Sequence, residues 1–216
     1  MATLHLIPAD IRQRYVVHEW RNATGVLSTA HAAEWEDIVA TLRKFRLYKA
    51  EILKGGGNKG NIAKRIDGEL FLRGWRETQF HTAIRVDAVE RASPTHKVDC
   101  FKSRVALEVE WNSKDSVYDR DLNNFRLLFD LRVIDVGVIV TRCTELEVLM
   151  IKLGRKKSSY GKSTTHIDKL LPKLEGGGGG GCPILVFGIG EKLYSEDEPP
   201  PLPDTPDKAE EDDDAI

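Results

Sequence analysis

Cysteine is scarce in this chain: Cys100, Cys143 and Cys182 are widely spaced and form no CxxC pair. An odd number of isolated cysteines argues against a disulfide framework and against a zinc site built on thiolates. The six histidines are scattered along the 216 residues and never cluster. We therefore expect neither zinc chemistry nor a histidine-ligated metal centre, and we expect a reduced, cytoplasmic protein.

Long apolar runs are absent as well. No run approaches the roughly 20 residues that a membrane helix needs, and residues 1–12 contain no signal-peptide hydrophobic core. Hydrophobic residues make up 41% and charged residues 31% of the chain, which is the balance of a soluble globular domain. We therefore expect a soluble protein of one domain with no membrane partner.

Charge is divided unevenly along the chain. Residues 191–216 hold 11 acids and two lysines, a net charge of −9, whereas residues 1–190 hold 30 bases and 23 acids, a net charge of +7. A basic body suits a polyanionic partner such as nucleic acid. We expect residues 1–190 to form the folded domain and the acidic, proline-rich residues 191–216 to be a disordered tail. Such a tail either solubilises the protein or competes with nucleic acid for the basic surface.

Hydrophobic periodicity predicts an α/β domain with a central mixed β-sheet flanked by helices. Strands are predicted at Tyr15–Trp20, Val105–Trp111, Val133–Val140 and Pro183–Ile189, with an extended region at Thr82–Val89. Helices are predicted at His31–Phe45, Ile62–Trp75, Tyr118–Leu131, Thr144–Leu153 and, ending before Pro172, Thr164–Leu171. Six consecutive glycines, residues 176–181, are predicted to form a slack link.

Three acids mark the candidate chemistry: Asp99, Glu108 and Glu110. Glu108 and Glu110 are two residues apart on a predicted strand, so both point to one face, while Val105, Leu107 and Val109 face the core. A turn or bulge between Asp99 and Glu108 would bring the third acid beside the pair. Converging carboxylates repel one another unless a cation joins them, and hard oxygen ligands suit Mg²⁺. The spacing alone fits an exposed strand with ordinary glutamates equally well.

The sequence around these acids resembles the BglII/BstYI family of type II restriction endonucleases, within the PD-(D/E)xK superfamily. The residues that carry the resemblance are Asp99, the Glu108-Val109-Glu110 strand, the helix at 122–131 and the segment Ile134-Asp135-Val136-Gly137-Val138. Flanking segments at 69–78 and 182–190 are similar to the family too, so the resemblance covers residues 10–190. It implies a restriction-endonuclease-like core and Mg²⁺-dependent hydrolysis of phosphodiester bonds in double-stranded DNA.

The resemblance also implies roles for the acids. Asp99 and Glu108 are expected to bind the metal, with the Val109 carbonyl as a third protein ligand. The superfamily has a lysine at the third position and the family a glutamine, whereas this chain has Glu110, as in the related enzyme BamHI. We expect Glu110 to orient or deprotonate the attacking water. Glu77 and Thr78 stand where the family has an auxiliary polar residue; we assign Glu77 to catalysis and Thr78 to DNA contacts.

Three segments are candidates for binding DNA. Asn112, Ser113 and Lys114 follow the catalytic strand, where the family contacts its site. A basic loop is placed like the family's recognition loop and contributes Arg155, Ser158, Ser159, Tyr160, Lys162, Ser163 and Thr164. Such side chains bind base edges or phosphates. Lys54, Asn58 and Lys59 belong to a glycine-rich loop that we expect either to hold phosphate or to close around the duplex.

The leading hypothesis is an endonuclease that cuts both strands of a short palindrome as a homodimer, because a symmetric DNA site matches a two-fold protein. By resemblance, the helix at 118–131 is expected to contribute to the dimer interface. Two alternatives remain open: a DNA-binding module without catalysis, and a repair nuclease of the same superfamily that recognises DNA structure.

Overall fold

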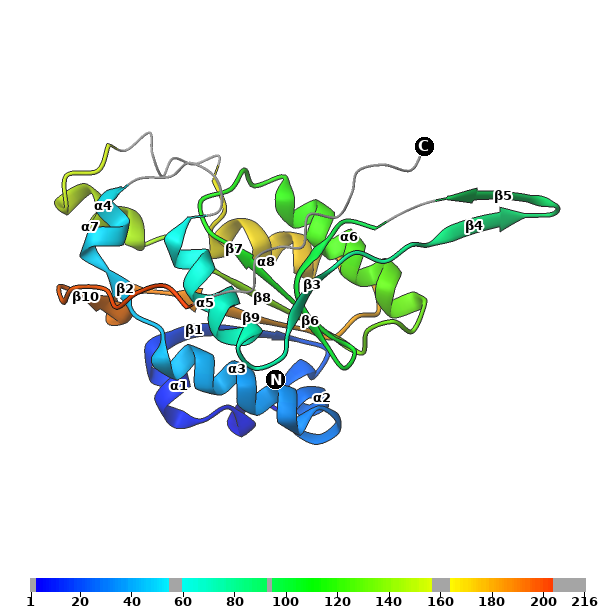
Figure 1. Ribbon diagram of the computed structural model, residues 1–216, viewed down its shortest axis with the longest axis horizontal. Coiled ribbons are helices and arrows are strands. Elements are labelled where there is room, and N and C mark those ends of the chain that lie inside the picture. The colour runs from blue at the N-terminus through cyan, green and yellow to red at the C-terminus, as the bar shows by residue number, and fades with distance from the viewer. Residues whose placement is uncertain (1–2, 55–59, 93–94, 157–163, 204–216) are drawn as a thin grey trace.

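A six-stranded mixed β-sheet forms the centre of the protein, with the strand order β1-β9-β8-β7-β6-β3 (Figure 1). The computed structural model describes residues 3–54, 60–92, 95–156 and 164–203. Strands β7, β8 and β9 are parallel, whereas β1, β6 and β3 each run antiparallel to their neighbour. The strands span Tyr15–Trp20 (β1), Arg76–Thr78 (β3), Val98–Lys102 (β6), Val105–Glu110 (β7), Val136–Arg142 (β8) and Ile184–Ile189 (β9). The predicted α/β class with a mixed sheet is confirmed.

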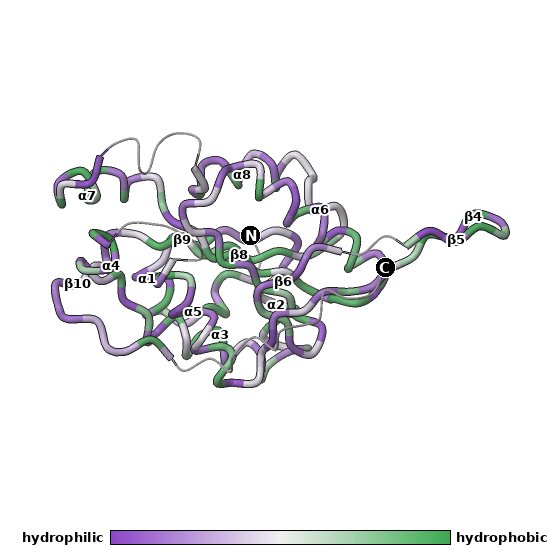
Figure 2. Tube along the Cα trace, turned by 45° about the horizontal axis from the view of Figure 1, so that its top comes forward, coloured by the Kyte–Doolittle hydropathy of each residue, from purple (hydrophilic) through white to green (hydrophobic). Residues whose placement is uncertain are grey.

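Helices cover both faces of this sheet. One core packs against helices at Ala9–Arg14 (α1), Ala23–Ala30 (α2), Ala32–Lys44 (α3), Lys49–Lys54 (α4), Asn61–Phe71 (α5) and Leu146–Lys152 (α7). The second core packs against Val117–Asp130 (α6) and Ile167–Glu175 (α8). Figure 2 shows the hydrophobic chain of β8 and β9 in the interior, between more hydrophilic helices. None of the helices in the described ranges is long and apolar enough to cross a membrane.

Strand β7 separates these two cores by its alternation. Val105, Leu107 and Val109 point into the larger core, as predicted, while Ala106 points into the second core. The opposite face of β7 is therefore covered as well, and Glu108 and Glu110 are buried on it. The alternative of a strand with ordinary exposed glutamates is wrong for these two residues.

Helix α6 lies close against the sheet at a glycine. A Cβ atom on Gly137 of β8 would lie 2.4 Å from Cδ2 of Phe125, a distance that real Cβ contacts do not reach. The ring of Phe125 therefore occupies the space that any larger residue at position 137 would need. This contact fixes the distance between α6 and β8.

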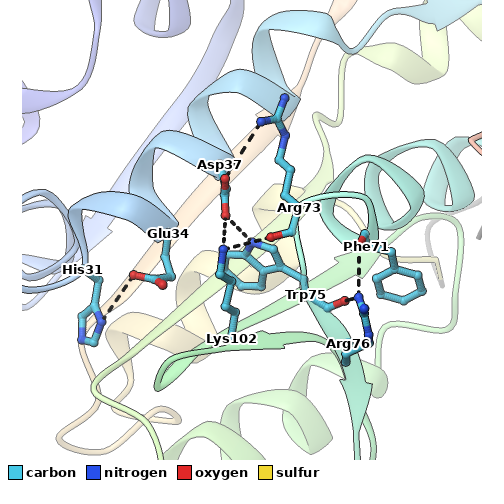
Figure 3. A network of polar contacts seen from close by, with 8 residues as sticks. All are labelled: His31, Glu34, Asp37, Phe71, Arg73, Trp75, Arg76 and Lys102. Atoms are coloured by element: carbon cyan, nitrogen blue, oxygen red, sulfur yellow. Dashed lines mark hydrogen bonds and ion pairs between the residues drawn. The ribbon is translucent and has the colours of Figure 1, made fainter.

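A polar network anchors strand β6, which carries Asp99. Asp37 on α3 accepts hydrogen bonds from Nζ of Lys102 at 2.8 Å and from Nε1 of the buried Trp75 at 3.0 Å. Lys102 also donates to the carbonyl oxygen of Arg73 at 2.9 Å. Figure 3 shows these contacts converging between α3, the turn after α5 and the end of β6. Because the indole of Trp75 finds an acceptor there, it is buried without the cost of an unsatisfied donor.

The six glycines at 176–181 form a packed turn, which corrects the predicted slack link. Gly177 and Gly180 have φ values of 88° and 57°, in the region that favours glycine. The amide of Gly178 donates to the carbonyl of Lys173 at 2.9 Å. A Cβ atom on Gly180 would lie 2.8 Å from Cγ of Arg126 on α6. The glycines are therefore needed for a tight fit.

We predicted that the helix at 164–171 would end before Pro172. Helix α8 instead runs from Ile167 to Glu175 and contains the proline. The helix buries Ile167, Leu170 and Leu174 in the second core. Burying these side chains outweighs the backbone hydrogen bond that a proline removes.

Several predicted boundaries also shift. Helix α5 ends at Phe71 because the chain turns at Gly74, where φ is 90°. Strand β8 begins at Val136, three residues later than predicted, because the amide of Val133 still caps α6 by donating to Leu128 at 2.8 Å. The extended region at 82–89 forms a hairpin of Ala83–Val86 (β4) and Val89–Ala92 (β5) that projects from the body (Figure 1).

The folded chain continues past residue 190, where we expected the disordered tail to begin. Glu191–Leu193 forms a 3₁₀ turn that buries Leu193, and Tyr194–Ser195 (β10) pairs with Leu47–Tyr48 (β2). Arg65 on α5 then donates to the carbonyl oxygen of Pro200 at 2.7 Å. The boundary predicted at residue 190 is therefore wrong, and the packed chain reaches at least residue 203.

Candidate active site

A β-hairpin brings Asp99 and Glu108 together. Ser103 and Arg104, with φ values of 44° and 72°, form the turn between β6 and β7, and the register pairs Cys100 with Leu107. Just beyond that pair, the amide of Asp99 donates to Oε2 of Glu108 at 3.2 Å, and the amide of Val109 donates to Oδ2 of Asp99 at 3.1 Å. The turn that the sequence required between the two acids is present.

Glu110 lies at the end of β7 and is 5% exposed, and Glu108 is 2% exposed. A fourth acid, Asp121 on α6, is 1% exposed and lies close enough to Glu110 to perturb it. Arg120 on the same helix contacts Asp121 at 2.8 Å and Glu110 at 3.5 Å. Asp99, Glu108, Glu110 and Asp121 are called the acid cluster below.

The sequence-based assignment missed Asp121 and Arg120. Tyr118, Asp121, Leu122 and Phe125 share one helical face by their spacing, and all four are buried. The presence of an acid within this apolar helical face is the sequence signal that could have identified Asp121. Arg120 lies beside that stripe, and only the folded structure shows its contact with Glu110.

Burial, together with neighbouring acids, raises the pKa values of Glu108, Glu110 and Asp121. Burial and the neighbouring Asp99 raise the pKa of Glu108 well above its usual value. Burial and the charge of Asp121 raise the pKa of Glu110 to about 8. Burial also raises the pKa of Asp121, although Arg120 opposes this effect. These carboxylates are therefore in an environment that a bound cation would relieve.

The donor chemistry of the cluster fits a hard divalent cation. Oε2 of Glu110 and Oδ2 of Asp121 are buried and have no hydrogen-bond partner in the described part of the chain. Carboxylate oxygens are the ligands that Mg²⁺ prefers. Within that same part, no three acidic, histidine or cysteine side chains are arranged as a preformed metal cage. One carboxylate oxygen of Glu108 instead accepts the amide of Asp99, and one of Asp99 accepts the amide of Val109.

The two auxiliary residues lie on the neighbouring strand β3. Thr78 pairs with Val98, next to Asp99, so Glu77 and Thr78 flank the acid cluster. Glu77 forms an ion pair with Lys97 at 3.9 Å, and the hydroxyl of Thr78 donates to the carbonyl of Arg76 at 3.2 Å.

Two of the proposed DNA-binding segments meet beside the acid cluster. Lys114 forms a β-bridge with Thr164. The amide of Ser113 donates to the hydroxyl of Thr165 at 3.1 Å, and the amide of Thr165 donates to the carbonyl of Ser113 at 2.8 Å. Ser113 also forms a hydrogen bond with Glu110. Asn112, with φ of 59°, forms the turn that leads from β7 into this contact. Segments more than 50 residues apart in sequence thus share one edge of the site.

The remaining candidates lie elsewhere or outside the described chain. Arg155 donates to the carbonyl of Leu53, adjacent to Lys54, at 3.2 Å. The ends of α4 and α7 are therefore neighbours, and they bring these two cations close in space. Seven of the predicted residues fall outside the described ranges: Asn58, Lys59, Ser158, Ser159, Tyr160, Lys162 and Ser163.

A mixed sheet with two acids on one strand, facing a third across a hairpin, defines the class of restriction-endonuclease-like proteins. Within this class, the family model for restriction endonuclease BglII/BglIII matches residues 15–189. The match begins at the first residue of β1 and ends at the last residue of β9. The chain belongs to the BglII/BglIII restriction endonuclease family, and so to the nucleases that act on double-stranded DNA. None of the curated proteins matches the chain.

Proposed function

We propose that this protein is a type II restriction endonuclease that cuts both strands of double-stranded DNA at a short palindrome, with Mg²⁺ as cofactor. The observation that carries the proposal is the buried acid cluster at the end of β7, directly beside the meeting point of Ser113 and Thr165. A site-specific nuclease needs base-reading and phosphate-cleaving groups close to each other, and our candidates for both roles lie at this edge of the sheet.

Asp99 and Glu108 would hold the metal, with the Val109 carbonyl as a third ligand. A bound Mg²⁺ supplies polarisation of the phosphodiester and a lower pKa for a nearby water. Burial of Glu108 keeps competing water away from its charge and would strengthen its hold on a cation. Glu77 would act from β3 as an auxiliary group.

Glu110 would orient the attacking water and take its proton. A general base works best when its pKa lies near the working pH. In the metal-free site, burial and Asp121 raise the pKa of Glu110 to about 8, so its carboxylate accepts a proton more readily than an ordinary glutamate.

Sequence recognition would come from the segments on the same edge. Asn112, Ser113, Lys114 and Thr164 are our candidates for base contacts, and Thr78, Lys54 and Arg155 for phosphate contacts. The undescribed candidates Asn58, Lys59, Ser158, Ser159, Tyr160, Lys162 and Ser163 stay proposals for the same roles. We further propose a homodimer through α6, in the cytoplasm, where the DNA to be cut is encountered.

The decisive experiment is digestion of plasmid DNA of known sequence, with Mg²⁺ and with a chelator. Discrete fragments whose mapped ends share one palindrome support the proposal. Cleavage confined to branched or damaged DNA would identify the structure-specific repair nuclease. DNA binding without any cleavage would identify the non-catalytic module.

A further inference from the structure

Arg120 closes the outer side of the acid cluster. Its Nε and Nη2 donate to Oδ1 of Asp121 at 3.0 and 2.8 Å, and Nη2 lies 3.5 Å from Oε1 of Glu110. The arginine side chain is 40% exposed, whereas the side chains of Glu110 and Asp121 are 6% and 1% exposed. One guanidinium therefore touches two buried acids and still faces solvent.

The contact between Arg120 and Glu110 matters because position 110 differs from the superfamily pattern. The superfamily that the chain resembles has a lysine at this third position, and this chain has a glutamate. A glutamate removes a cation from the site and adds an acid. Arg120 comes from α6, a different element, yet it brings a cation to the side chain at that same position.

The guanidinium also has donors to spare. Its contacts with Asp121 and Glu110 use Nε and Nη2, so within the described residues the two N–H groups of Nη1 remain for a further acceptor. A guanidinium presents its donors in a planar fork that matches phosphate oxygens. With Asp121 fixing one edge of the fork, the other edge is held in a defined direction.

We propose that Arg120 supplies the active-site cation in place of the superfamily's lysine, contacting the scissile phosphate while it holds Glu110 in position. This inference rests on the proposed nuclease function. A fixed donor aimed at the phosphate stabilises the charge that develops there in the transition state. The contact spans two elements, because Glu110 is on β7 and Arg120 is on α6.

The alternative is that Arg120 only neutralises Asp121. The two roles separate in a comparison of Arg120→Ala, Arg120→Lys and the double variant Arg120→Ala/Asp121→Asn. Arg126→Ala is the matched control, because Arg126 is on the same helix and forms an exposed pair with Asp130. Each protein is tested for folding by urea denaturation, for single-turnover cleavage with saturating Mg²⁺, and for metal-free DNA affinity across a salt series.

We expect Arg120→Ala to slow cleavage roughly 100-fold, the usual effect of losing one preorganised donor. The double variant recovers part of the stability, because the acid that Arg120 contacts most closely is removed as well, but it stays slow. Without metal, both variants show a salt dependence of binding that is shallower by about 0.9, the loss of one phosphate contact. Arg120→Lys keeps the slope and loses part of the rate, which keeps the test valid if Arg120→Ala does not fold. Arg126→Ala behaves like wild type.

A double variant that cleaves at the wild-type rate would overturn the inference and leave the nuclease function standing. An unchanged salt slope in Arg120→Ala would overturn the phosphate contact in the same way. Wild-type protein that shows no Mg²⁺-dependent cleavage of any DNA would overturn the proposed function, and this inference with it.

Discussion

The proposed metal site depends on two carboxyl groups, those of Asp99 and Glu108. Across the hairpin, Glu108 accepts a hydrogen bond from the amide of Asp99 at 3.2 Å, and Asp99 accepts one from the amide of Val109 at 3.1 Å. The two contacts help to place both carboxylates. We expect Asp99→Asn and Glu108→Gln to reduce cleavage by roughly 1,000-fold or more, because both lose the charge that we propose to hold the metal. DNA affinity should survive, since it comes mainly from phosphate contacts.

Single-turnover cleavage and metal-free filter binding measure the two effects separately. The amide variants keep the shape of the side chain, so misfolding does not account for a loss. Near wild-type cleavage by either variant would show that the metal ligands are assigned wrongly.

The raised pKa values predict how stability depends on pH in the absence of metal. The pKa of Glu110 is raised to about 8 in the folded protein, against roughly 4.3 for an unfolded chain. Between these values the folded state binds more protons than the unfolded state, so the free energy of unfolding falls as the pH rises. The raised pKa values of Glu108 and Asp121 act in the same direction.

We therefore expect the urea midpoint of the metal-free protein to be lower near about pH 8.5 than near about pH 5.5. Glu110→Gln should flatten this dependence, because the amide does not titrate. A midpoint that rises across the window would contradict the burial of these acids.

Two substitutions at position 110 test its role. Glu110→Gln keeps the shape but loses the ability to accept a proton, so we expect weak residual cleavage. Glu110→Lys places a second cation beside Arg120, 3.5 Å from the present carboxylate, and near the metal. We expect almost no cleavage from the lysine variant. Full activity in both variants would make Glu110 a bystander.

At this scale the sequence predicted three of the four clustered acids. Asp99, Glu108 and Glu110 follow from strand alternation and one turn, which are local. Asp121 depends on how α6 crosses the end of β7, which is a matter of tertiary packing. Ser113 was a candidate, but its hydrogen bonds with Thr165 join segments that no local pattern connects.

At the scale of elements, α6 connects the site to the proposed dimer interface. Its inner face buries Tyr118 and Phe125, while Leu127 and Leu131, at its carboxyl end, are 37% and 50% exposed. We expect Leu127→Glu with Leu131→Glu to weaken dimerisation roughly 30-fold or more, about 2 kcal/mol for lost central contacts. Analytical ultracentrifugation across a concentration series measures the change.

Leu72→Glu is the matched control, because Leu72 is 62% exposed just after α5 and away from α6. It should leave the association unchanged. A wild-type protein that stays monomeric at micromolar concentration, with and without DNA, would rule out the proposed dimer.

Elements were predictable where one strong period governs a segment. β1 was predicted with its bounds, and β7 and α6 within about a residue, because their apolar positions repeat without interruption. The glycine turn and Pro172 were misjudged because local propensity favours flexibility and helix ends, whereas packing against Arg126 and the second core decides the outcome. The projecting hairpin carries no core-facing alternation for a sequence pattern to detect.

For the whole molecule, the predicted acidic tail divides into two parts. Residues 204–216 hold seven acids and one lysine, a net charge of −6, and follow the packed segment. Deleting them should leave the melt unchanged and tighten binding to random-sequence DNA at low salt, where the Debye length exceeds roughly 10 Å. Deleting residues 191–216 also removes the buried Leu193, which should cost about 2 kcal/mol of stability.

Binding of both truncated proteins to random DNA across a salt series, together with their thermal melts, checks this division. Equal affinity of the shorter deletion and the full chain at every salt concentration would leave the tail as a solubilising segment. An unfolded 1–203 protein would show that the boundary is again misplaced.

The strand order also constrains the order in which the sheet can form during synthesis on the ribosome. Of the six strands in the described central sheet, β1 leaves the ribosome first and pairs with β9, which leaves after the other five. Between those moments β6, β7, β8 and α6 have already emerged, so the acid cluster can assemble while the nascent chain still exposes the open edge of β8. Release of residues 184–189 then joins both halves in one step. The sheet of the newborn chain therefore stays open until β9 has left the ribosome.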